Sequence, residues 1–260
     1  MKFPLSFYQP LNVLEEKISF HKEKGVHVEI ALSDTTYNRE VSVRQLEKLA
    51  VILREAELKV TAHLPFHDLR LASRDRHIVE YSIEVLTEAL EIGKILGGNV
   101  GVLHTGYTPQ VPLDHMEAWM DLAATNLSEL TQRAADEDFR LALRNLWEPD
   151  AEIFTTLIER VGMDNLGVCP DLGHAACYSS LAPEEWIVTF KDRLFDLHFH
   201  DNDGMSNQHA ACGQGVVGYD SILEVMKGLG APVNVTLDVP EDAVDPSLEH
   251  LLSVGFDFER

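Results

Sequence analysis

The 260-residue chain has few cysteines and no long apolar run, and both absences limit what it can be. Its three cysteines, Cys169, Cys177 and Cys212, are an odd number without CxxC spacing. We therefore expect free, buried thiols in a reducing compartment rather than a disulfide framework. No run of about eighteen apolar residues occurs, and the N-terminal MKFPLSFYQP lacks the apolar segment of a signal peptide. These features predict a cytoplasmic protein without a membrane span.

Basic residues are also scarce. The chain has 21 lysines and arginines against 43 aspartates and glutamates, which gives a formal net charge of −22 at pH 7. This excess of negative charge repels phosphate backbones and leaves no broad basic stripe, so nucleic acid is a disfavoured partner. No GxGxxG or GxxxxGK[ST] motif follows an early strand-like segment, which removes the usual phosphate-loop argument for an open, doubly wound sheet.

The sequence does contain a repeating alternation of strand and helix patterns. Eight short apolar segments rich in β-branched residues are KFPLSF, HVEIAL, KVTAHL, NVGVLH, RLALRN, LGVCPD, LFDLHF and VNVTLDV. Amphipathic segments with apolar residues three and four apart lie between them, as in 11–25, 42–58, 76–98 and 115–138. Ser42 and Gln45 predict a capping box, and Gly25 and Gly97 stand where helices should end.

Eight strand and helix units in about 250 residues predict a single (β/α)8 barrel over residues 1–260, with a doubly wound sheet as the alternative. The carboxyl ends of barrel strands meet at one mouth, where chemistry gathers. Polar residues lie on or just after nearly every expected strand, and one more, His209, lies in the loop after the seventh. They are Glu29, His63, His104, Arg144, Glu148, Asp171, His174, His198, His200, His209 and Asp238. Imidazoles and carboxylates together favour a divalent metal site, with Zn or Mn as the ion.

The ordered motifs HLPFH, VLHTG, LALRN, GVCPDLGHA, LHFHDN and TLDV resemble those of the xylose isomerase-like TIM barrels. This superfamily holds sugar isomerases and epimerases together with endonuclease IV-type zinc nucleases. The metal ligands that the resemblance implies are Asp171, His198 and Asp238 for the shared site, His63 and His104 for a further zinc of the nucleases, and His174 and His209 for their third zinc. Asn207 stands where that third site usually has an aspartate.

Arg144 departs from the pattern of this superfamily, because the matching position normally carries the glutamate that binds or bridges the metals. An arginine stays protonated and repels a divalent ion. In one arrangement its guanidinium pairs with Asp171 and Asp238 in place of a metal. In another, a small shift of register or a turned-aside Arg144 leaves Glu148 to supply the missing carboxylate. Glu29 is expected either to accept a hydrogen bond from substrate or to pair with Arg144.

The resemblance implies isomerisation or epimerisation of a small sugar or hydroxy-carbonyl compound, with metal polarising a carbonyl while carboxylates move a proton. Glu148 and Asp238 are the candidate catalytic carboxylates. Arg144, Glu29 and His200 are the candidate substrate-binding residues, with Arg144 suited to a sugar acid or phosphate. The two alternatives are an endonuclease IV-like zinc phosphodiesterase and a metal-depleted barrel that binds a ligand without catalysis. The sequence is compatible with a homo-oligomer and leaves the assembly open.

Overall fold

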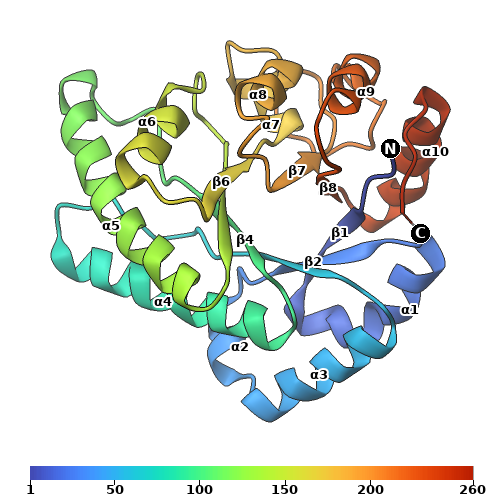
Figure 1. Ribbon diagram of the computed structural model, residues 1–260, viewed down its shortest axis with the longest axis horizontal. Coiled ribbons are helices and arrows are strands. Elements are labelled where there is room, and N and C mark those ends of the chain that lie inside the picture. The colour runs from blue at the N-terminus through green and yellow to red at the C-terminus, as the bar shows by residue number, and fades with distance from the viewer. Residues whose placement is uncertain (260) are drawn as a thin grey trace.

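The computed structural model describes residues 1–259, in which eight parallel strands form a nearly closed barrel surrounded by helices (Figure 1). The strands are β1 (Leu5–Pro10), β2 (His27–Ala31), β3 (Val60–His63), β4 (Val100–His104), β5 (Arg140–Arg144), β6 (Leu166–Cys169), β7 (Asp196–Phe199) and β8 (Asn234–Leu237). The strand order is β6-β5-β4-β3-β2-β1-β8-β7, so the last strands pair next to the first, as in a barrel. Isolated bridges, including one from Asp171 to His198, join β6 to the β7 side. The predicted (β/α)8 barrel is confirmed.

The helices follow the strands around the outside of the barrel. They are α1 (Leu14–Lys24), α2 (Thr35–Glu40), α3 (Val43–Glu55), α4 (Arg76–Ile95), α5 (Met116–Asp136), α6 (Glu152–Val161), α7 (Leu172–Tyr178), α8 (Pro183–Thr189), α9 (Tyr219–Lys227) and α10 (Val244–Val254), with short 3-10 turns η1 (Leu11–Val13), η2 (Leu113–His115) and η3 (Glu241–Ala243). The predicted capping box of Ser42 and Gln45 begins α3, and Gly25 ends α1 in a left-handed conformation. Within residues 1–259 no helix has the length and apolar character needed to cross a bilayer.

The first strand lies further along the chain than the sequence pattern predicts. The apolar segment covers residues 2–7, whereas β1 spans Leu5–Pro10 and pairs with β2 as far as Pro10 opposite Ala31. The end of this strand is fixed by hydrogen bonding to its neighbour rather than by its own composition. As a result Tyr8, which lies beyond the predicted strand, lines the cavity at the mouth.

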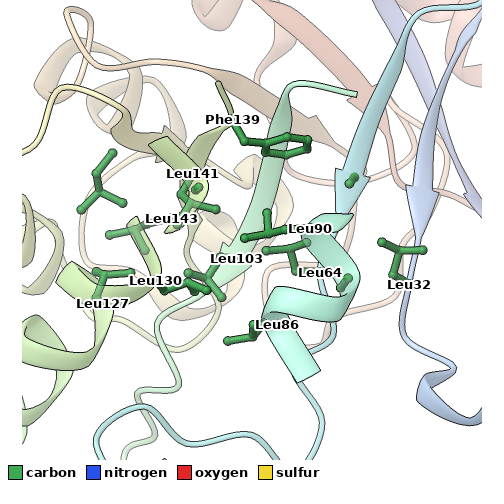
Figure 2. Packing of buried hydrophobic residues seen from close by; sticks show 14 of the residues in the cluster. Leu32, Leu64, Leu86, Leu90, Leu103, Leu127, Leu130, Phe139, Leu141 and Leu143 are labelled. Atoms are coloured by element: carbon green, nitrogen blue, oxygen red, sulfur yellow. The ribbon is translucent and has the colours of Figure 1, made fainter. Parts of the chain in front are cut away.

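A leucine-rich layer between the strands and the outer helices forms the larger part of the core (Figure 2). Leu86 and Leu90 of α4 and Leu127 of α5 belong to one buried cluster with Leu103 of β4. Burying each of these side chains contributes about 1.5–3 kcal/mol. Successive strand residues point to opposite faces, so packing Leu103 outward turns His104 into the barrel. The outer core thereby fixes which polar side chains reach the mouth.

Candidate functional site

Strand alternation brings four polar side chains to the centre of the mouth. Leu143 on β5 lies in the leucine-rich layer, so its neighbour Arg144 faces the barrel interior. His63 ends β3, Asp171 follows β6 by two residues and Asp238 directly follows β8. Because the carboxyl ends of all eight strands point the same way, residues far apart in the sequence meet at this level.

Arg144 occupies the middle of this group. Its Nε lies 3.0 Å from Oδ2 of Asp171, and its Nη2 lies 2.5 Å from Oδ2 of Asp171 and 2.5 Å from Oδ2 of Asp238. Nη1 donates to Nε2 of His63 at 2.7 Å. Burial alone would raise the pKa of both carboxyls, but the positive groups around them, Arg144 included, hold each pKa well below its usual range. The guanidinium therefore pairs with the two aspartates and does not turn aside.

His63 and His104 are neutral imidazoles beside this cation. Burial and then the charge of Arg144 lower the pKa of His63 to about 4, and its Nδ1 donates to the carbonyl oxygen of Leu64 at 3.2 Å. Burial likewise places the pKa of His104 well below its usual range. The two rings lie 5.6 Å apart, and both line the cavity. The Nε2 lone pair of His63 is already used by Arg144, so it is not free for a metal.

A second charged pair lies deeper in the barrel. Nε2 of His198 lies 2.9 Å from Oε1 of Glu29, and its Nδ1 lies 3.6 Å from Oδ2 of Asp238. Burial opposes ionisation of Glu29, but the adjacent His198 lowers its pKa overall. The pKa of His198 is raised well above its usual range despite burial, because acidic groups including Glu29 and Asp238 surround it. Below them, burial raises the pKa of Asp196 to about 7.

Two further histidines and Asn207 form what we call the histidine rim (His174, His209 and Asn207). Nδ1 of His174 lies 2.8 Å from the carbonyl oxygen of Asn145, and Nδ1 of His209 lies 2.7 Å from that of Asp238. The amide Nδ2 of Asn207 lies 3.0 Å from Nε2 of each ring. Rings held in this way direct both Nε2 atoms at one point, as in metal-binding histidines. Oδ1 of Asn207 is buried without a hydrogen-bond partner among the described residues.

Two groups of potential metal ligands result from this arrangement. The first group is Asp171, His198 and Asp238, and the second is His174, His200 and His209. Within each group the potential ligand atoms lie within 4.8 Å of one another. The first group does not fit a metal, because Nη2 of Arg144 lies 2.5 Å from both aspartates. In the second group Nε2 of His200 lies 2.9 Å from Oδ1 of Asp171. The histidine rim does fit a metal, since turning the Asn207 amide would add its oxygen to the two imidazole nitrogens.

A cavity of about 550 Å³ opens at the mouth. Its lining includes Arg144, Glu148, Asp238, His63, His104, His174 and His209, with the aromatic residues Tyr8, Phe66, Tyr107, Trp147 and Tyr178. Glu148 is only 2% exposed, so it is not a solvated loop acid. Its Oε2 accepts from the backbone N–H of Leu146 at 2.7 Å, and its Oε1 accepts from the hydroxyl of Thr105. Burial raises the pKa of Glu148.

The predicted site residues divide into a cavity wall and a layer behind it. Glu29, Asp171, His198 and His200 are fully buried and are not part of the cavity lining. Glu29 was expected either to accept a hydrogen bond from substrate or to pair with Arg144, and His200 was expected to contact substrate. In the structure Oε1 of Glu29 lies 2.9 Å from Nε2 of His198, and Nε2 of His200 lies 2.9 Å from Oδ1 of Asp171.

Sequence reasoning missed one contributor to the site, Tyr8, and assigned no role to a second, Asn145. Tyr8 was missed because β1 begins and ends later than its composition indicates. Asn145 stands out in the sequence only as a polar residue at a strand end, yet its side chain accepts from the N–H of Asp171 at 2.7 Å and donates to its carbonyl oxygen at 3.0 Å. Its position next to Arg144, at the end of a buried strand, was the available signal. Asn145 therefore fixes Asp171 relative to β5.

Comparisons with known proteins agree with this architecture. A family model described as "Xylose isomerase-like TIM barrel" matches residues 25–254. An uncharacterized protein of Methanocaldococcus jannaschii is 26% identical over 226 residues, which cover 83% of this chain and 74% of that protein. A structure of a Thermus thermophilus protein from a ZnCl2 soak is 27% identical over 96% of this chain and 97% of that one, with a TM-score of 0.81. A D-tagatose 3-epimerase-like protein is 24% identical over 98% of both chains, with a TM-score of 0.84.

Proposed function

Because the chain belongs to the xylose isomerase-like TIM barrel family, we propose that it is an isomerase or epimerase of a small sugar or related hydroxy-carbonyl compound. The observation that carries this proposal is the cavity of about 550 Å³, whose wall holds the buried carboxyl of Glu148 and the guanidinium of Arg144. Small-molecule sites typically enclose about 300–1,000 Å³, so a monosaccharide fits this volume. The aromatic residues of the wall offer apolar faces to the C–H groups of a sugar.

Glu148 is the better candidate for the group that moves the proton. Burial raises its pKa, which brings a carboxylate closer to the range that suits a base near neutral pH. Asp238 has a strongly lowered pKa, so it is a weak base and serves to hold Arg144 and His209. In the reaction, Glu148 takes the proton from the carbon next to a carbonyl, and the electron pair of that C–H bond forms the C=C bond of an enediolate, whose negative oxygen accepts from the remaining N–H of Arg144 Nη1. Return of the proton by Glu148 to the neighbouring carbon gives the isomer, and delivery of a proton from water to the opposite face of the first carbon gives the epimer.

Arg144 supports binding of a neutral substrate oxygen. One N–H of its Nη1 has no acceptor among the described residues, and Arg144 lines the cavity. Its charge is already balanced by Asp171 and Asp238, so it offers little net attraction to a phosphate or carboxylate. A neutral sugar therefore suits this wall better than the sugar acid or sugar phosphate that the charge of Arg144 alone indicates.

The histidine rim is the proposed position for a Zn or Mn ion. His174 and His209 would supply imidazole nitrogens and Asn207 its amide oxygen. When bound there, the ion supplies positive charge to a substrate oxygen. Metal analysis of the purified protein and of the double variant His174→Ala/His209→Ala tests this assignment. Loss of metal from the variant supports it, and equal metal content in both proteins contradicts it.

Exchange of substrate hydrogen with solvent tests the reaction even before the substrate is identified. The protein, loaded with Zn²⁺ or Mn²⁺, is incubated in D2O with a panel of ketoses and aldoses, and deuterium entering next to the carbonyl is followed by NMR. We expect exchange with at least one neutral sugar, and a loss of about 10²–10⁴-fold in Glu148→Gln. Glu152→Gln, an exposed acid on α6, is the matched control and should keep the activity. Absence of exchange across the panel would contradict the proposed reaction.

A barrel that binds a sugar without converting it is the second candidate, favoured by the arginine held between Asp171 and Asp238. Saturable binding of a panel sugar, with no exchange, would identify this case. The endonuclease alternative has less support, because Arg144 engages two of its expected acidic ligands and the charge of −22 opposes DNA.

A further inference from the structure

The centre of the mouth combines the donor set of a metal site with a built-in cation. Ligand atoms of Asp171, His198 and Asp238 approach within 4.8 Å of one another, which is close enough to hold one ion. Nη2 of Arg144 lies 2.5 Å from an oxygen of each aspartate. Arg144 is held on a third side by Nε2 of His63 and is only 3% exposed. The cation is thus supplied by the chain itself and is enclosed on several sides.

We infer that Arg144 is a permanent replacement for a divalent ion at this centre: it balances Asp171 and Asp238, joins β3, β5, β6 and β8, and keeps metals out. A guanidinium stays protonated and cannot coordinate a metal, and its five N–H groups match carboxylate geometry. To enter, an ion would have to break two buried ion pairs and approach a fixed positive charge at a few ångströms. Any metal that the protein binds therefore lies outside this centre.

The charges make the replacement testable. Changing Arg144 to glutamate lowers the charge of the centre by two, and a bound divalent ion restores the original total. The Arg144→Glu variant should therefore be unstable without metal. It should bind one ion between the introduced carboxylate and the side chains of Asp171, His198 and Asp238. The unaltered centre should show no such dependence on metal.

The test uses the His174→Ala/His209→Ala double variant as background, so that metal binding reports on the centre alone. Binding of MnCl2 is measured by electron paramagnetic resonance, and thermal unfolding is compared in EDTA and in MnCl2. With Arg144 present, we expect no stoichiometric Mn²⁺ and no change in Tm. With Arg144→Glu, we expect one bound Mn²⁺ and a rise in Tm of about 5–10 °C, the shift for an ion at about a hundred times its dissociation constant.

Two further variants keep the test decisive if Arg144→Glu does not fold. Arg144→Met removes the cation and leaves three ligands, so it should also gain Mn²⁺ binding. Arg140→Met, at the exposed start of the same strand, is the matched control and should gain none. Stoichiometric Mn²⁺ in the background with Arg144 intact would overturn the inference, as would the absence of any gain in both Arg144 variants. These measurements use no substrate, so their outcome is independent of the exchange assay for the proposed reaction.

Discussion

Removing the charge of Asp171 should destabilise the fold far more than removing a surface charge. In Asp171→Asn the side-chain oxygen can still cap α7 at the N–H of His174, but the amide N–H groups face the guanidinium of Arg144. Asp171 is fully buried, and breaking a buried ion pair by removing one partner costs about 3–5 kcal/mol. For a chain of this size that corresponds to a fall in Tm of roughly 6–20 °C.

The matched control is Asp164→Asn, which removes an exposed ion pair. Asp164 lies 3.1 Å from Nη2 of Arg193, and its side chain is fully exposed to solvent. Exposed pairs contribute about 0–1 kcal/mol, so this variant should unfold close to the parent protein. Both variants are compared by urea and thermal unfolding in EDTA, which removes any contribution from metal at the histidine rim.

The difference between Asp171→Asn and the parent should depend on pH. The folded-state pKa of Asp171 lies well below 3.8, its value without the fold, so its charge contributes stability above pH 3.8. That contribution is lost as the pH falls through the folded-state pKa. The difference should be complete at pH 7 and should shrink below about pH 4. A difference under about 1 kcal/mol at pH 7, or one that is unchanged in acid, would refute the account of a buried ion pair.

Two further predictions concern the layer behind the cavity. A Cβ added at Gly173 would lie 2.1 Å from Cε1 of His200, so Gly173→Ala should lower the free energy of unfolding in urea by about 1–3 kcal/mol. In the control Gly230→Ala, the added Cβ meets nothing within 4 Å, and the free energy of unfolding should hardly change. Equal effects of the two substitutions would argue against close packing at Gly173. Glu29→Gln removes the anion 2.9 Å from Nε2 of His198, so the raised pKa of that histidine should fall, as followed by NMR of its ring nitrogens. Because the folded-state pKa of His198 lies above 6.5, its charge contributes stability below pH 6.5, and this contribution is lost as the pH rises through the folded-state pKa. In Glu29→Gln this pH dependence of stability should be lost. An unchanged titration of His198 would contradict its pairing with Glu29.

The barrel could be predicted from the sequence because its signals are local. Apolar segments of strand length alternate with amphipathic segments of helix length, and the capping box at Ser42 lies within four consecutive residues. Such patterns depend on backbone geometry and side-chain periodicity, which act over a few residues. The first strand was misplaced by a few residues, because its pairing with β2 and β8 is not a local property.

The sequence predicted which residues form the candidate site but not which of them contact one another. The sequence placed histidines and carboxylates at the strand ends and singled out Arg144 as the residue that breaks the metal pattern. It left open whether Arg144 pairs with Asp171 and Asp238 or turns aside for Glu148. The outcome depends on where the guanidinium of Arg144 points, and its partners Asp171 and Asp238 lie 27 and 94 positions away along the chain.

By itself the sequence determined the (β/α)8 fold, the end of the barrel that carries the polar groups, and the chemistry those groups offer. Only the tertiary structure decided which groups face the cavity and which are buried behind it. The carboxyl of Glu148 is buried in the cavity wall, whereas Glu29 and His200 lie behind that wall. The physical reason is that burial, charge pairing and the pKa shifts they cause arise between strands distant in sequence, and exist only once the barrel brings those strands together.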